Sequence, residues 1–189
     1  MPRHNARSAL DLPSGTYDAA FSCFGIFLFP DRATGWRSAA EALRPGGLFV
    51  TSVWRGPEFN ELARFQMAPL MAALPARLTD PSPQAPWAGI GTADGLIQEV
   101  TDSAPFDDPE VHIVDATLAI PSPTDMWRGM VGNPITGALI AQCDTVEKDK
   151  VRHAAIEAFE QRSGGSDRPL LVQASCHVLV ARRMADGFN

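Results

Sequence analysis

Hydrophobic and polar positions in residues 17–54 predict a strand, a helix and a second strand. The short, mostly apolar run Ala19–Phe24 is typical of a strand that is covered on both faces. The next apolar residues recur at spacings of three and four, as on one face of a helix: Ala33, Trp36, Ala40 and Leu43. Pro45 cannot continue that helix, and Gly46-Gly47 predicts a tight reversal before the apolar run Leu48–Trp54. The block therefore predicts two parallel strands joined by a right-handed crossover.

Later segments show the same two kinds of periodicity. Apolar residues from Phe59 to Leu74 lie at helical spacings, and Thr92 is a suitable N-cap for a short helix. Alternating apolar positions in Glu110–Ile120 predict a strand, and the apolar run Leu170–Ala181 predicts the last strand. Between these two strands we expect a helical insertion over residues 122–163.

Two helix-start signals support this insertion. Ser122 precedes Pro123, and Asp144 with Glu147 forms the sequence pattern of a capping box. With 189 residues, the chain is long enough to bury a core of its own. We therefore expect residues 1–189 to form a single α/β domain.

The strand-helix-strand block also resembles a known family. The segment YDAAFSCFGIFLFPD, followed by ALRPGG and LFVTSVW, resembles the second half of a class I S-adenosylmethionine (SAM)-dependent methyltransferase that acts on a small molecule. The resemblance implies a partial Rossmann-like methyltransferase sheet, with strands that resemble the fourth to seventh of the family. It implies the strand order fourth, fifth, seventh, sixth, with an antiparallel last strand after a helical insertion.

The resemblance covers most of this chain but not the whole family domain. In the family, a glycine-rich loop after the first strand and an acidic residue at the end of the second hold the methyl donor, and this sequence shows neither. Two explanations stay open: a truncated product of a longer gene, which the position of Met1 favours, or a shortened relative that no longer binds the donor alone. We expect the isolated chain to be inactive and to bind SAM weakly or not at all unless the N-terminal half is supplied.

The candidate cofactor residues lie in two places. The resemblance places Ser8 and Ala9 in the loop that contacts adenine, where the family often has Asp; a shifted alignment would use Asp11 instead, and a plain loop is the alternative. The other candidates end the strand that resembles the fourth, because ligands of open α/β sheets bind beyond the carboxyl ends of strands. They are Ser22, Cys23, Phe24 and Gly25.

The candidate substrate pocket combines one strand end with the insertion. Trp54 ends the second strand and is predicted to form a wall of the acceptor pocket. Met126, Trp127 and Met130 are predicted to form an apolar lid, with ordinary core packing as the alternative. We expect Trp54 and the lid residues to border one pocket.

Histidines and cysteines do not assign a catalytic base or a metal site. His112 and His177 lie in predicted strands, where we expect hydrogen-bonded structural histidines rather than bases. Cys23 and Cys176 are expected to be small buried hydrophobes. No group of His, Cys, Asp and Glu has the spacing of metal ligands.

Charge and hydropathy exclude other classes of partner. The net charge of −6 argues against nucleic acid, since phosphate binding needs clustered Lys and Arg. No apolar run is long enough to span a membrane, and the N-terminus does not resemble a signal peptide, which indicates a cytoplasmic protein. We expect a small-molecule substrate, no nucleic acid and no membrane.

Three functions remain, in order of preference: a small-molecule methyltransferase present as its C-terminal portion, a non-catalytic methyltransferase-like binding or interaction protein, and a nicotinamide-dependent oxidoreductase. In the implied sheet, the strand Tyr17–Phe24 lies at an edge, and natural proteins rarely leave an apolar edge bare. Residues 5–12, a second copy or a separate completing chain could cover it. We favour self-association, because a segment as short as residues 5–12 cannot replace two strands and their helices.

Overall fold

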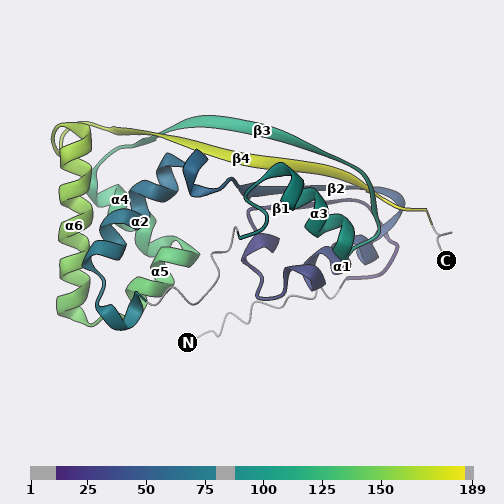
Figure 1. Cartoon of the computed structure of the whole chain (residues 1–189), viewed down its shortest axis with the longest axis horizontal. Helices are drawn as coiled ribbons and strands as arrows, with labels where there is room; N and C mark the ends of the chain where they lie inside the picture. Colours follow the sequence, from purple (N-terminus) through teal and green to yellow (C-terminus); the bar gives the residue numbers. More distant parts are fainter. Residues whose placement is uncertain (1–11, 80–87, 186–189) are drawn as a thin grey trace. The chain divides into compact units, whose positions relative to one another are not determined.

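The computed structural model describes residues 12–79 and 88–185 (Figure 1). Strands and helices alternate in the first half, and three helices separate the last two strands. The elements are β1 (Tyr17–Cys23), α1 (Arg32–Ala42), β2 (Leu43–Trp54), α2 (Glu61–Ala73), α3 (Ala93–Ser103), β3 (Phe106–Ile120), α4 (Pro123–Gly132), α5 (Pro134–Ala141), α6 (Thr145–Ser163) and β4 (Leu170–Arg183). The predicted α/β class is confirmed, and so is the helical insertion before the last strand.

The four strands form one sheet in the order β1-β2-β4-β3. β1 pairs parallel to β2, and β4 pairs antiparallel to β2. This is the strand order that the sequence predicted. β1 consequently has one neighbouring strand, β2, among the described residues.

The second strand begins earlier than the sequence indicates. Tyr17 pairs with Leu43 and Ala19 with Leu48. An advance of two residues along β1 therefore corresponds to an advance of five residues along β2. The extra residues bulge out at the Pro-Gly-Gly segment, where Gly46 has a φ of 75° that suits glycine. The glycines therefore make a bulge inside the strand rather than a turn before it.

The described residues fall into two compact units. The first unit contains those within Met1–Gly56, Ala85–Val114 and Ser175–Asn189, and the second those within Pro57–Gln84 and Asp115–Ala174. Each unit has its own buried cluster. The single-domain organisation of residues 1–189 stays a prediction.

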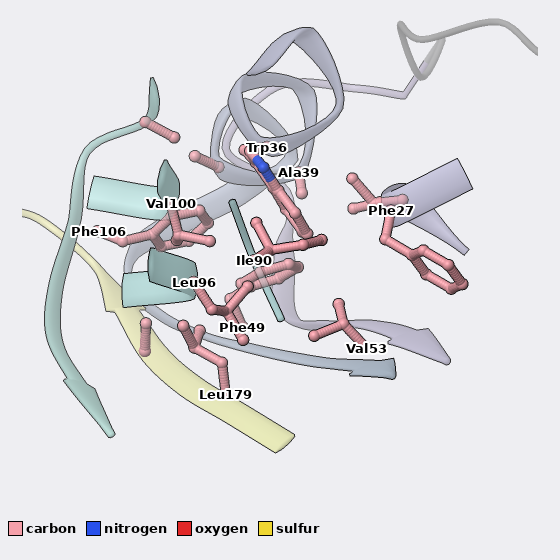
Figure 2. Close-up of a cluster of buried hydrophobic side chains, with 14 of the residues drawn as sticks. Phe27, Trp36, Ala39, Phe49, Val53, Ile90, Leu96, Val100, Phe106 and Leu179 are labelled. Carbon is pink, nitrogen blue, oxygen red and sulfur yellow. The ribbon is translucent and has the colours of Figure 1, made fainter. Parts of the chain in front are cut away.

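In the first unit, α1 and α3 pack on one face of the sheet (Figure 2). Phe49 of β2 stacks on Phe106 with ring centroids 4.7 Å apart and meets the edge of Trp36 at 6.0 Å. Glu99 joins the two helices: its carboxylate accepts hydrogen bonds from Arg32 Nε (2.8 Å) and from Trp36 Nε1 (3.0 Å). This face of the sheet is therefore covered by packed aromatic side chains, and hydrogen bonds to Glu99 hold the two covering helices together.

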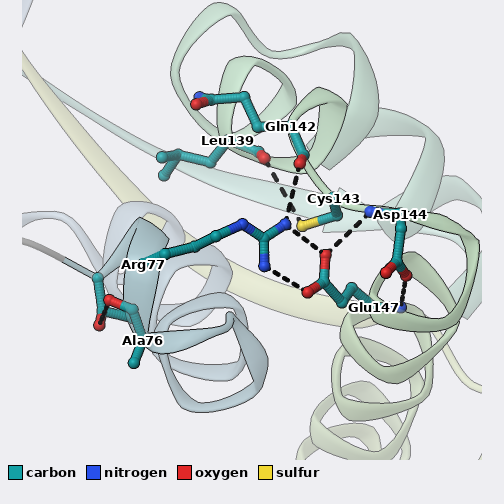
Figure 3. Close-up of polar contacts among 8 residues, drawn as sticks. Ala76, Arg77, Leu139, Gln142, Cys143, Asp144 and Glu147 are labelled. Carbon is teal, nitrogen blue, oxygen red and sulfur yellow. Dashed lines mark hydrogen bonds and ion pairs between the residues drawn. The ribbon is translucent and has the colours of Figure 1, made fainter.

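The second unit is a helical cluster around Met126, Met130 and Phe159. The predicted capping box at the start of α6 is confirmed: Glu147 N donates to Asp144 Oδ1 (2.8 Å), and Asp144 N donates to Glu147 Oε2 (2.9 Å). Arg77 adds an ion pair to the same Glu147 carboxylate (Figure 3). This pairing, with the Asp144 N–H, lowers the pKa of Glu147 to about 2.

Candidate functional site

The carboxyl ends of β1 and β2 lie side by side because these two strands are parallel. Cys23 pairs with Ser52, two residues before Trp54. In open α/β sheets, ligands bind just beyond such strand ends. This edge therefore holds four predicted cofactor residues, Ser22–Gly25, together with one predicted pocket residue, Trp54.

The loop that leaves β1 is held by hydrogen bonds to two serines. Ser22 Oγ accepts from Ile26 N at 3.1 Å. Ser52 accepts twice from Phe24 N, through its carbonyl oxygen at 3.2 Å and through its Oγ at 3.1 Å. A Cβ added to Gly25 would lie only 3.2 Å from Ser22 Oγ, so the turn also needs a small residue there. The predicted residues thus form one tightly bonded strand end.

Phe24 has an unusual backbone conformation. Its φ is 49°, in the left-handed region that bulky residues avoid. Such a residue costs about 1–3 kcal/mol and persists only where the surrounding structure imposes it. Because strained residues of this kind cluster at binding and catalytic sites, Phe24 is the residue of this loop that most clearly indicates function.

Phe24 and Trp54 form the aromatic wall of this edge. Their rings stack with centroids 4.2 Å apart and an interplanar angle of 22°. Both side chains are half-buried, so part of each ring remains accessible. The structure therefore brings a predicted cofactor residue into contact with a predicted pocket residue. The sequence did not predict this contact.

The prediction for Cys23 is wrong. Its side chain is exposed rather than buried, because β1 lies at the end of the sheet. Cys176 is half-buried, while Cys143, on the insertion, is the buried thiol. Burial raises the pKa of Cys143, which makes it a poor nucleophile.

The other predicted site residues are less informative. Ser8 and Ala9 lie outside the described residues. Met126 and Met130 are fully buried in the core of the second unit, and Trp127 packs against that core. This burial is the ordinary core packing that the sequence left open as the alternative to a lid. The shared pocket with Trp54 stays a prediction.

Sequence reasoning missed a polar group beside the same edge. Arg55, the residue after β2, donates from its backbone N to Ser175 O at 3.2 Å and from Nη1 to Ser175 Oγ at 3.1 Å. His177 pairs with Val53 across the β2–β4 ladder and is almost fully buried. The signal was present in the sequence, because Ser175 and His177 are polar residues among the mostly apolar residues 174–181.

At Nδ1, His177 lacks the hydrogen bond that the sequence predicted. Its Nδ1 is buried and has no hydrogen-bond partner among the described residues. Burial, and secondarily the positive charge of Arg55, lowers the pKa of His177. Both effects favour the neutral form of the imidazole.

Two further observations concern metal ions and membranes. Within residues 12–79 and 88–185, no cluster of three or more His, Cys, Asp or Glu side chains is arranged to hold a metal ion. None of the helices in these ranges combines the length and hydropathy of a membrane span.

No protein-family model and no curated protein matches the chain. Among solved structures, a Bacillus halodurans protein described as a "putative methyltransferase" is similar over 94% of this chain and 69% of its own, with 14% identity and a TM-score of 0.52. The YcgJ protein from Bacillus subtilis is similar over 94% and 68%, with 13% identity and a TM-score of 0.50. The chain has the Rossmann-like fold of these proteins.

A third structure carries the methyl donor. Phosphoethanolamine N-methyltransferase 2 from Haemonchus contortus, solved with S-adenosyl-L-methionine, matches 92% of this chain and 35% of its own at 12% identity. Its TM-score of 0.41 is too low to support a conclusion about this chain. The similarity of the first two structures is a similarity of fold, and their identities are too low to transfer an activity.

Proposed function

We propose that this chain is the C-terminal portion of a SAM-dependent methyltransferase that acts on a small molecule. The observation that carries the proposal is the strained Phe24 stacked on Trp54 at the carboxyl ends of two parallel strands. The Leu43-Arg44-Pro45-Gly46-Gly47 signature and the strand order β1-β2-β4-β3 support it. The similarity of fold to the Bacillus halodurans protein is consistent with it.

The described strand ends fit one part of SAM. Aromatic faces attract a neighbouring cation and stack on a purine, so Phe24 and Trp54 suit the sulfonium or adenine portion. Neither β1 nor β2 ends in Asp or Glu, so these strand ends offer no carboxylate for the ribose hydroxyls. The fit is therefore partial, and the rest of the donor would need residues beyond those described.

Bound SAM would supply an electrophilic methyl group on a sulfonium. The residues of this chain would contribute position rather than acid-base chemistry: Phe24 and Trp54 form an apolar wall, and Ser22 and Ser52 fix the loop that carries Phe24. Alignment of two reacting groups alone is worth about 7–11 kcal/mol of a barrier. A site of this kind therefore does not require a catalytic triad.

An NMR titration with SAM tests the proposal. We expect weak binding, with shifts confined to Ser22–Gly25 and Trp54, and we expect Phe24→Ala to abolish them. Ile113→Ala, at an exposed residue of β3 in the first unit and at the other end of the strand order from β1, is the matched control and should leave the shifts unchanged. A dissociation constant below about 10 μM for the isolated chain would contradict the view that it holds only part of the donor site.

The alternative is a non-catalytic methyltransferase-like binding or interaction protein. The absence of a glycine-rich donor-binding loop from the sequence favours it. If SAM produces no shifts at Phe24 and Trp54 even at saturating concentration, this alternative replaces the methyltransferase proposal.

A further inference from the structure

The outer edge of β1 is apolar and exposed. β1 stands at one end of the sheet, so every second backbone N–H and C=O group of the strand faces away from β2. The side chain of Phe21, in the middle of the strand, is 74% exposed. Exposed edge strands of this kind are templates for pairing with another chain.

The opposite edge of the sheet differs in composition. Within the first unit, β3 carries Asp107, Asp108, Pro109 and Glu110 in succession. Proline and charged side chains are the means by which natural edge strands prevent pairing. β1 has no proline and no lysine, so the two edges of one sheet differ in their protection.

The charge of β1 does not oppose pairing with a copy of itself. Its single charged side chain, Asp18, forms an ion pair with Arg44 at 2.8 Å. If two copies of β1 run antiparallel about Ala20, Asp18 lies opposite Ser22 of the second copy rather than opposite another carboxylate. In the same arrangement, Phe21 lies opposite Ala19, so that a large side chain meets a small one.

The face around Phe21 would extend such a contact. Phe21 pairs with Val50 of β2, and Val50 pairs with Val180 of β4, so the three side chains form a row across the sheet. Val50 and Val180 are half-buried, and all three lie outside the cluster that α1 and α3 cover. A second copy would therefore gain apolar contacts beside the backbone hydrogen bonds.

We infer that β1 binds β1 of a second copy of this chain, antiparallel and centred on Ala20, to form a continuous sheet across a two-fold dimer. The same surface patch serves both copies, as a two-fold interface requires. The inference rests on the exposure, charge and pairing of β1 among the described residues.

Sedimentation velocity over a range of protein concentrations tests the dimer. The chain should dimerise, and Phe21→Lys should raise the dimer dissociation constant roughly tenfold or more, because an edge lysine opposes pairing. Ile113→Lys on β3, where the native side chain is 53% exposed, is the matched control and should not change the constant. Circular dichroism of both variants checks that they are folded.

A disulfide experiment tests the register. In the proposed pairing, Tyr17 lies opposite Cys23 of the second copy, and both residues are exposed. Tyr17→Cys should therefore give a covalent dimer on mild oxidation, and the double variant Tyr17→Cys/Cys23→Ser should not. A monomer in which β1 is paired on both sides within its own chain would overturn the inference, as would a dimer whose dissociation constant is unchanged by Phe21→Lys.

Discussion

The two compact units differ in the residues that occupy left-handed backbone positions. Among the described residues, only glycines do so in the second unit, whereas Phe24 and Asp108 join the glycines in the first. In the second unit, α6 ends at Gly164, whose φ of 79° is easily adopted by glycine, and begins with a complete capping box. In the first unit, the left-handed position after β1 is occupied by Phe24. The core of the first unit also buries His177, whose Nδ1 lacks a partner among the described residues.

This difference helps to distinguish residues that serve stability from residues that serve function. Where local preference and the fold agree, as around α6, the residues are explained by stability alone. Where a residue conflicts with its own backbone or burial, the conflict persists because something else maintains it. Among the described residues of the first unit, these conflicts are Phe24 after β1, Asp108 in β3 and His177 in β4. Phe24, which stacks on Trp54, is the one that marks the candidate site.

The largest effect is expected at Phe24. Phe24→Ala should lower the free energy of unfolding by about 0.5–1.5 kcal/mol through loss of the aromatic stack, in addition to the area that it exposes. Phe24→Gly should be more stable than Phe24→Ala by about 1–2 kcal/mol, because glycine adopts the left-handed conformation without strain. Urea unfolding followed by circular dichroism measures both.

The same pair of substitutions at Phe59 is the control, since Phe59 is not among the residues with positive φ. There, glycine should be no better than alanine. Equal stabilities of the alanine and glycine variants at Phe24 would show that its backbone is not strained, and the contrast between the two units would disappear.

A smaller effect is expected at the start of α6. Asp144→Ala should lower the free energy of unfolding by about 1 kcal/mol, because it leaves helical N–H groups without an acceptor. Asp149→Ala, an exposed position inside the same helix, makes the same chemical change without removing a cap. If both variants lose the same stability in thermal unfolding, the capping box is not what stabilises this end.

The smallest expected effect is a pH dependence from His177. Its pKa is lowered from 6.5 in the folded chain, so below that value the unfolded chain binds the proton more readily. Stability should therefore fall as pH drops below about 6.5 and level off above it. Melting temperatures across this range measure the slope.

The variant His177→Gln should reduce that slope. A slope that His177→Gln leaves unchanged would show that this buried imidazole is not its source, and the contrast between the units would be weaker.

Periodicity and capping signals predicted the order of the elements because these signals are local. Thr92 caps α3 and Ser122 caps α4, each through a side-chain oxygen that accepts a backbone N–H of the following turn. The exposure of Cys23 could not be predicted, because it depends on the neighbours of β1 in the sheet rather than on its own apolar sequence. The strained backbone of Phe24 has no sequence signal, since an aromatic residue is unexpected there.

The position of β4 between β2 and β3 has a consequence for synthesis on the ribosome. β3 is made before β4, yet β4 is the strand that joins it to β2. Until residues 170–183 emerge, the nascent chain holds β3 without a neighbour among the described strands. Pairing over such long sequence separations is slow, and unpaired strands are prone to aggregation. The last strand made therefore sets the moment at which the sheet can close, and chaperones would be needed before that moment rather than after it.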